Sequence, residues 1–180
     1  MTKRRGKADW LELGLKLLRD EGEQALTLER LCQDMGLTRG SFYHHFQNVA
    51  AYRTALLEQW LDTLTEAPIR QSQDAADALE ELERLVSDLD HSLDLAFRAW
   101  ARRSPEVAAA VEVVDARRVS YLTTLHRRTG HAQPVQLAEL TYAVFVGAQT
   151  LGWVAGRPAF RALFQQVLAG LAVDPARAGV

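Results

Sequence analysis

Apolar residues recur every three or four positions along almost the whole chain, and no stretch alternates between apolar and polar residues as a half-buried strand would. The clearest stripe consists of Trp10, Leu11, Gly14, Leu17 and Leu18. This stripe predicts a first helix over about 8–21, which Gly22 ends. We therefore expect an all-α protein of about nine helices.

Residues that favour helix caps mark the next elements. Thr27, Thr38 and Asn48 can each accept a hydrogen bond from the first turn of a helix. The two threonines predict short helices over 28–35 and 39–46, separated only by the tripeptide "GLT", and Asn48 predicts a longer fourth helix.

Prolines and a polar segment divide the rest of the chain. The fourth helix is expected to end at Pro68, and the polar residues that follow, 69–78, are expected to form a loop leading into the next helix. Five further helices are predicted over about 75–89, from 90 or 92 to 103, and over about 105–128, 134–156 and 158–173.

The two short helices are too short to be stable alone, so they must pack on the first helix. The residues available for this packing are Leu28, Leu31, Cys32, Met35, Leu37, Phe42 and Phe46. The second short helix then turns a polar face outward, formed by Arg39, Gly40, Ser41, Tyr43 and His44. This arrangement is typical of a helix-turn-helix, whose second helix enters the major groove of DNA.

The distribution of charge supports this interpretation. The formal net charge is only −2, so nucleic-acid binding requires a local concentration of positive charge. No acidic residue occurs between Asp34 and Glu58, whereas Arg39 and Arg53 lie inside this window. The N-terminal arm adds Lys3, Arg4, Arg5 and Lys7. An acid-free, basic segment is what a phosphate-facing surface requires.

Each polar residue of this segment has a plausible role. Arg39 can donate two hydrogen bonds to a guanine edge, and Ser41 can bond to a base or a phosphate. Gly40 allows close approach of the backbone. Phosphate contacts are expected from Thr27, Tyr43, His44 and His45. Tyr43 and His45 can alternatively bury part of their rings in the core.

From Ala8 to Leu57 the sequence resembles the tetracycline-repressor (TetR) family of transcriptional regulators. The most specific features are the glycine after the first helix and the frame "T…L…G…G.FY.HF". The resemblance implies an all-helical homodimer with a helix-turn-helix domain over 1–47, which includes the basic arm. It also implies a regulatory and dimerisation domain over 48–180, with the helix 48–66 connecting the two.

By position, the resemblance places the family's DNA contacts on Thr27, Thr38, Arg39, Gly40, Ser41, Tyr43, His44 and His45. The sequence departs from the family pattern at the start of the fourth helix. Val49 and Ala50 stand where many members have a lysine, often followed by a glutamate. One phosphate contact is therefore missing, and Arg53 or the basic arm is expected to replace it.

The C-terminal two-thirds holds more apolar helix than a DNA-binding module needs. Small residues four apart predict a dimer interface on one helix, completed by aromatic residues; we assign to it Ala148, Gly152, Trp153, Gly156, Phe160 and Phe164. A pocket for a small-molecule effector is predicted from aromatic and polar residues: Phe97, Trp100, Tyr121, His126, Tyr142 and Phe145. Plain core packing of the same residues is the alternative.

Two pairs of opposite charges in this region are expected on helix surfaces. Asp94 and Arg98 are four residues apart, and Asp115 and Arg118 are three apart, which are the spacings of neighbours on one helix face.

Other classes of protein are disfavoured. No glycine-rich phosphate loop, metal-ligand spacing or nucleophile elbow occurs, so we expect no enzyme, metal or cofactor. The single Cys32 excludes an internal disulfide and suits a cytoplasmic location, and no secretory signal is expected. The apolar stretch 137–156 is interrupted by polar residues, which favours a buried helix over a membrane span.

We therefore predict a ligand-responsive repressor that binds a palindromic operator as a homodimer and is released by an effector. The alternative is a helical protein-interaction module, or a protein-sensing regulator, on the same fold.

Overall fold

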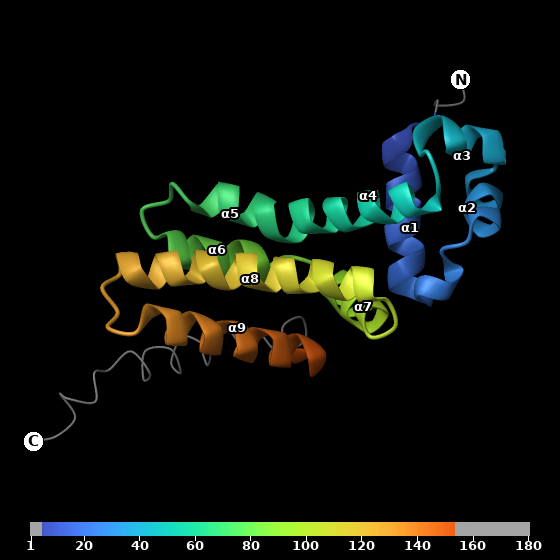
Figure 1. The fold of residues 1–180 in the computed structure, drawn as a ribbon. Helices are drawn as coiled ribbons and strands as arrows, with labels where there is room; N and C mark the ends of the chain where they lie inside the picture. Colours follow the sequence, from blue (N-terminus) through green and yellow to red (C-terminus); the bar gives the residue numbers. More distant parts are fainter. Residues whose placement is uncertain (1–4, 154–180) are drawn as a thin grey trace, which may run out of the picture. The chain divides into compact units, whose positions relative to one another are not determined.

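The computed structural model describes residues 5–153, in which every regular element is a helix (Figure 1). The helices are α1 Lys7–Glu21, α2 Leu28–Met35, α3 Arg39–His45, α4 Val49–Leu61, α5 Ala67–Ser72, α6 Ala78–Ser87, α7 Ser92–Ala101, α8 Pro105–Arg128 and α9 Pro134–Thr150. A short 3₁₀ turn, Glu23–Ala25, follows α1. No helix in this part of the chain is long and apolar enough to cross a membrane. The predicted all-α class is confirmed.

The chain forms two compact units. The N-terminal unit contains the described residues up to Thr63 together with Ser92–Val111. The C-terminal unit contains Leu64–His91 together with the described residues from Glu112 onward. The main chain passes between the units after α4, before α7 and within α8. The first seven residues of α8 thus belong to the N-terminal unit.

The core of the N-terminal unit forms around α1, which contacts α2, α4 and α7. All five residues of the predicted stripe on α1 are buried. The Tyr52 hydroxyl of α4 donates a hydrogen bond to the Trp10 carbonyl at 2.9 Å. Burial raises the pKa of Tyr52, so the hydroxyl stays protonated and can donate.

The three predicted caps are confirmed. The side chains of Thr27, Thr38 and Asn48 accept hydrogen bonds from backbone N–H groups at 3.2, 3.3 and 2.7 Å, respectively. Gly36 ends α2 in the left-handed conformation, with φ at 63°. Glycine adopts this conformation without steric cost, so it allows the tight turn between α2 and α3.

The prediction that Pro68 ends the fourth helix is wrong. A five-residue π-helix, Asp62–Glu66, follows α4 and leads directly into α5. Pro68 lies in the first turn of α5, where its missing N–H costs no intrahelical hydrogen bond. Ile69 and Ser72, expected in a loop, are helical and buried because they pack within the C-terminal unit.

Asp94 is not a surface residue, which contradicts the expected pairing on the helix surface. Its side chain is only 1% exposed, and its carboxylate accepts a hydrogen bond from Trp60 Nε1 at 2.6 Å. Phe97, on the next turn of α7, stacks on the Trp60 ring with centroids 4.5 Å apart. This buried contact holds α7 to α4 inside the N-terminal unit.

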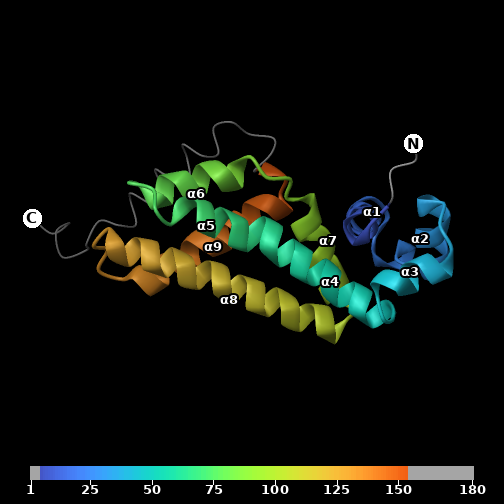
Figure 2. The same cartoon turned by 90° about the horizontal axis from the view of Figure 1, so that it is seen from above.

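Two small apolar clusters lie in the described part of the C-terminal unit. One contains Ile69, Tyr121 and Leu125, and the other contains Leu122, Ala138 and Tyr142. Residues of α6 pack against both clusters. The C-terminal part of α8 therefore lies beside α9, as both ribbon views show (Figures 1 and 2).

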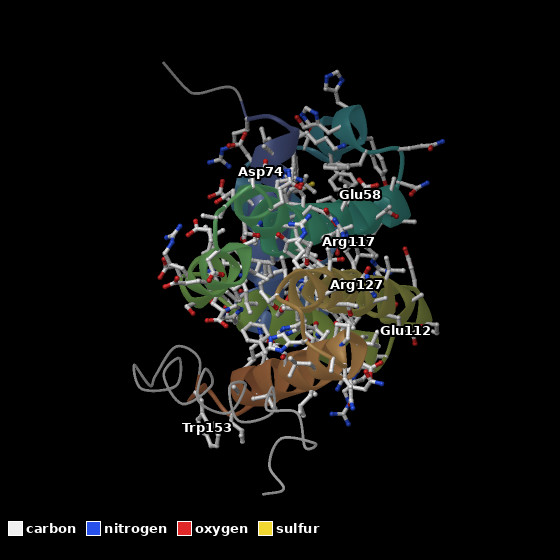
Figure 3. All side chains as sticks on the ribbon, turned by 90° about the vertical axis from the view of Figure 1, so that its left-hand side faces the viewer. Glu58, Asp74, Glu112, Arg117, Arg127 and Trp153 are labelled. Carbon is white, nitrogen blue, oxygen red and sulfur yellow. The ribbon has the colours of Figure 1, made fainter. Side chains whose placement is uncertain are left out.

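Polar contacts join the π-helix to α8 in the same unit. Arg117 of α8, labelled in Figure 3, donates to both carboxylate oxygens of Glu66 at 2.7 and 3.1 Å. Arg118 donates to the Thr65 hydroxyl at 2.8 Å. The hydroxyl of Tyr142 donates to Asp115 at 2.6 Å. Asp115 and Arg118 are thus half-buried and contact residues beyond α8, so they do more than form a surface pair.

Candidate nucleic-acid interface

An aromatic cluster holds the short helix α3 in place. Phe42 is fully buried and packs edge-on against Trp10 and Tyr52, with ring centroids 5.5 and 5.3 Å apart. Phe46, one turn along the chain, lies 5.1 Å from Phe42. A helix of seven residues is unstable in isolation, so this anchoring is what makes α3 a rigid element.

The opposite side of α3 is polar and open to solvent. Arg39, Gly40, Tyr43 and His44 are exposed, whereas Ser41 and His45 are half-buried. The Tyr43 ring packs edge-on against Phe42 but remains 50% exposed, so both of its predicted roles are compatible with its position.

Thr27 and Thr38 are exposed at the starts of α2 and α3. Each hydroxyl oxygen accepts the capping hydrogen bond, which leaves its O–H free to donate to a phosphate. Capping and phosphate binding are therefore compatible at both residues.

The described part of the basic arm lies against the helix-turn-helix. The guanidinium of Arg5 donates to the Met35 carbonyl at the end of α2. The ammonium of Lys7 lies 5.6 Å from the centre of the Phe46 ring. Lys3 and Arg4, also assigned to the arm, lie outside the described residues.

An acidic residue that the sequence analysis missed lies next to the principal candidate for base reading. Glu29 of α2 accepts from Arg39 Nη2 at 2.5 Å. No acidic residue lies between Asp34 and Glu58 in the sequence. The turn between α2 and α3 nevertheless brings Glu29, which precedes this window, next to Arg39, the first basic residue inside it. The sequence could have indicated this contact only through the positions of the two residues, because each occupies the first turn of one of two consecutive short helices.

Arg53 or the basic arm was expected to replace the missing lysine contact. Its guanidinium carbon lies 5.9 Å from the centre of the Trp100 ring on α7. The residue remains exposed, so replacement of the phosphate contact by Arg53 stays a prediction.

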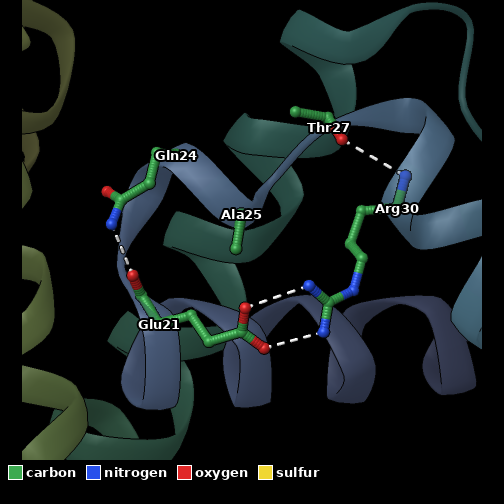
Figure 4. Close-up of a pocket in the computed structure, with 5 residues that line it drawn as sticks. All are labelled: Glu21, Gln24, Ala25, Thr27 and Arg30. Atoms are coloured by element: carbon green, nitrogen blue, oxygen red, sulfur yellow. Dashed lines mark hydrogen bonds and ion pairs between the residues drawn. The ribbon is translucent and has the colours of Figure 1, made fainter.

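A hollow of about 330 Å³ lies beside the start of α2 (Figure 4). Arg30 crosses it and donates to both carboxylate oxygens of Glu21 at 2.8 and 3.0 Å. Arg30 Nε also donates to Asp34 at 2.8 Å. These hydrogen bonds raise the pKa of Arg30, with Asp34 contributing most. The contacts hold α2 to the end of α1 and neutralise the arginine, so we do not assign it to phosphate binding.

The half-buried Cys32 lies on α2. Burial raises the pKa of its thiol, which disfavours the reactive thiolate. No cluster of three or more potential metal ligands occurs among residues 5–153.

The six predicted pocket residues divide between the two units. Phe97 and Trp100 belong to the N-terminal unit, where their rings stack with centroids 6.0 Å apart. The other four belong to the C-terminal unit: Tyr121, His126, Tyr142 and Phe145. Within that unit, the Tyr121 and Ser72 hydroxyls share a buried hydrogen bond of 2.9 Å. Phe145 packs against the cluster that contains Tyr142.

His126 is an unusual member of this group. Its side chain is 1% exposed, its Nε2 lies 3.4 Å from the Thr141 hydroxyl, and its Nδ1 has no hydrogen-bond partner among the described residues. Burial, and to a smaller extent the charge of His131, lowers the pKa of His126. The ring is therefore neutral near pH 7, and it keeps one buried nitrogen without a hydrogen bond among the described residues.

The predicted dimer residues are only partly described. Helix α9 ends at Thr150, and Gly152 has a left-handed φ of 68°. The expected stripe of small residues therefore does not continue along one helix, because a left-handed residue interrupts the helical repeat. Ala148 is buried, Gly152 is exposed and Trp153 is half-buried. Gly156, Phe160 and Phe164 lie outside the described residues.

The comparison with protein families addresses the helix-turn-helix directly. Residues 11–51 match the family described as bacterial regulatory proteins, tetR family. This domain belongs to the tetR family. The resemblance predicted from the glycine and "FY.HF" frame is thereby confirmed, and the matched segment contains α2, α3 and the exposed polar face. The tetR-family domain makes the chain a DNA-binding regulator of the helix-turn-helix type.

The likeness to a solved structure extends over nearly the whole chain. A crystal structure of E. coli NemR in its reduced form shares 18% identity, with a TM-score of 0.72. The match covers 92% of this chain and 95% of NemR. At this identity the comparison establishes a shared fold. No match to a curated protein sequence was found.

Proposed function

We propose that this tetR-family protein is a ligand-responsive repressor that binds a palindromic operator as a homodimer in the cytoplasm. The observation that carries the proposal is the exposed polar face of α3, held rigidly by the buried Phe42. One short reading helix spans only a few base pairs, and two of them, one helical turn apart, specify a longer inverted repeat.

Arg39 is the proposed base-reading residue because it is exposed at the first position of α3 and can form two hydrogen bonds with guanine. The phosphate contacts are assigned to Thr27, Thr38, Tyr43 and His44, with half-buried Ser41 and His45 at the edge of the surface. Gly40 allows the backbone to approach the DNA.

The effector is proposed to bind in the C-terminal unit. Tyr121 and Tyr142 each belong to one of the two apolar clusters, and Phe145 packs against the cluster of Tyr142. The buried His126 adds a ring nitrogen without a hydrogen bond among the described residues. An apolar wall with a few polar anchors is typical of small-molecule sites. We infer that the effector is largely apolar and carries one or two hydrogen-bonding groups.

Release from DNA is proposed to follow from a change in the C-terminal unit that reaches α4. Only Phe46, Gln47 and Asn48 separate α3 from α4, and the π-helix after α4 leads into the C-terminal unit. An effector that binds one of two dimer conformations more tightly would shift the population toward that conformation. Release follows if the distance between the two α3 helices in it does not fit the operator.

The experiment that tests this proposal first selects bound sequences from a random duplex pool. The protein is then titrated with duplexes that contain the full inverted repeat or one half-site, and light scattering measures the mass of each complex. Two chains should bind the full repeat in a single transition, and the half-site should bind much more weakly. One chain per duplex with equal affinity for both would refute the dimeric operator. No binding at any salt concentration would favour the alternative of a protein-sensing module.

A further inference from the structure

The contact between Glu29 and Arg39 joins the two helices of the helix-turn-helix on its exposed side. Arg39 Nη2 lies 2.5 Å from Glu29 Oε1, with the two side chains 62% and 79% exposed. Glu29 is the second residue of α2 and Arg39 is the first of α3, so both extend from rigid helical ends rather than from a loop.

The geometry leaves both side chains able to bind a base pair. A guanidinium has five N–H donors, and Glu29 occupies one hydrogen of Nη2. The remaining donors still permit a two-bond contact with the O6 and N7 atoms of guanine. The carboxylate also retains unused lone pairs, and a carboxylate can accept a hydrogen bond from the N4 amine of cytosine.

We propose that Glu29 is a specificity-determining residue that acts with Arg39 as one reading pair for G·C-containing sequence. This inference rests on the proposed base-reading role of Arg39. Glu29 fixes the direction of the guanidinium and offers an acceptor that only a base with an exposed amine can satisfy. It also repels phosphates, so the acid lowers non-specific attraction to DNA and thereby increases discrimination.

The test replaces the carboxylate with an amide of the same shape, Glu29→Gln. Sequences are selected from a random duplex pool, and affinities for the selected and a scrambled duplex are measured over a range of salt concentrations. We expect Glu29→Gln to bind the scrambled duplex more tightly and to lower the ratio of specific to non-specific affinity roughly fivefold or more. For the scrambled duplex, the salt slope should steepen by about one, because Arg39 released from Glu29 can meet a phosphate.

Glu58→Gln serves as the matched control, because this exposed carboxylate lies near the end of α4 (labelled in Figure 3) and loses the same charge. The double variant Glu29→Gln/Arg39→Ala separates pairing from general charge. If Glu29 acts through Arg39, the glutamine should steepen the salt slope much less in the Arg39→Ala background, where no guanidinium is released. Thermal unfolding checks that each variant is folded.

Three outcomes are distinguishable. A reduced specificity ratio and a steeper salt slope in Glu29→Gln, both absent in Glu58→Gln, support the reading pair when Arg39→Ala suppresses the change in slope. If the wild type selects a sequence and Glu29→Gln keeps the same preference and salt slope, the pair is refuted while the proposed base reading stands. If the wild type selects no sequence, the proposed function fails, and the reading pair fails with it.

Discussion

At the scale of single residues, Gly14 determines how closely α1 and α4 approach. A Cβ atom at this position would lie 1.8 Å from the Tyr52 hydroxyl oxygen and 3.1 Å from Leu56 Cδ2. The same hydroxyl binds the Trp10 carbonyl, so it cannot move away without loss of a buried hydrogen bond. The sequence placed Gly14 on the buried stripe but gave no reason for a glycine, because the reason is a side chain 38 positions away.

We predict that Gly14→Ala lowers the free energy of unfolding by about 1–3 kcal/mol through overpacking. Tyr52→Phe alone should cost about 1 kcal/mol, because it removes the hydrogen bond to Trp10. In the Gly14→Ala background, the same substitution should stabilise the protein, because it removes the clashing oxygen. Denaturant unfolding of the wild type and the three variants measures this reversal of sign, and additive losses would contradict the close contact.

Arg39 and its neighbours were identified from the sequence because exposure of α3's polar face follows from helical spacing. Arg39→Ala should abolish sequence preference and leave the melting temperature within a few degrees of wild type, because the side chain is exposed. Arg127→Ala on α8 (labelled in Figure 3) is the control, since it removes one exposed cation outside the helix-turn-helix. Binding assays on selected and scrambled duplexes should show a loss of preference in Arg39→Ala and none in Arg127→Ala. An unchanged preference in Arg39→Ala would exclude its base-reading role.

At the scale of helices, the capping residues predicted correctly where α2, α3 and α4 begin. Pro68, in contrast, led to a wrong prediction of where the fourth helix ends. Thr27, Thr38 and Asn48 act through hydrogen bonds to residues three positions away, so the local sequence suffices. The helical turn after Pro68 depends instead on the burial of Ile69 beside Tyr121, which lies far along the chain. Tertiary packing of this kind overrides local preference and is not visible in a short window.

The buried pairing of α4 with α7 leads to a second stability prediction. Asp94→Ala should destabilise the protein by about 1–3 kcal/mol, because the Trp60 N–H would remain buried without its acceptor. Trp60→Phe removes that donor, so Asp94→Ala should cost less in the Trp60→Phe background. A double-mutant cycle by chemical denaturation gives the coupling energy. Zero coupling would show that the Trp60–Asp94 hydrogen bond contributes nothing.

His126, near the end of α8, leads to a prediction about pH. Its folded-state pKa lies below its ordinary value of 6.5, so the unfolded chain binds the proton more readily. The stability associated with the neutral ring should therefore be fully present above about pH 6.5 and decline as pH falls through 6.5 toward the lower folded-state pKa. Unfolding measured from pH 7.5 to 5 should show a smaller decline for His126→Gln than for wild type. Identical pH profiles would contradict a buried neutral His126.

At the scale of the whole molecule, the sequence predicted a helix-turn-helix followed by a larger helical region, and the tetR-family match confirms the first part. The contacts within the chain group α7 and the start of α8 with the DNA-binding helices. Sequence order could not indicate this grouping, because it arises from contacts such as Trp60 with Phe97 between distant helices. The Glu29–Arg39 contact escaped detection for the same reason, since a window along the chain does not follow the turn.

The central claim is that a dimer of this chain reads an inverted repeat through α3. Selection of bound sequences from a random duplex pool, at two salt concentrations and with Arg39→Ala in parallel, tests it most directly. We predict enrichment of an inverted repeat with half-sites about one helical turn apart, retained at the higher salt and lost in the variant. Binding that falls with salt equally for all sequences, with no repeat enriched, would contradict the claim.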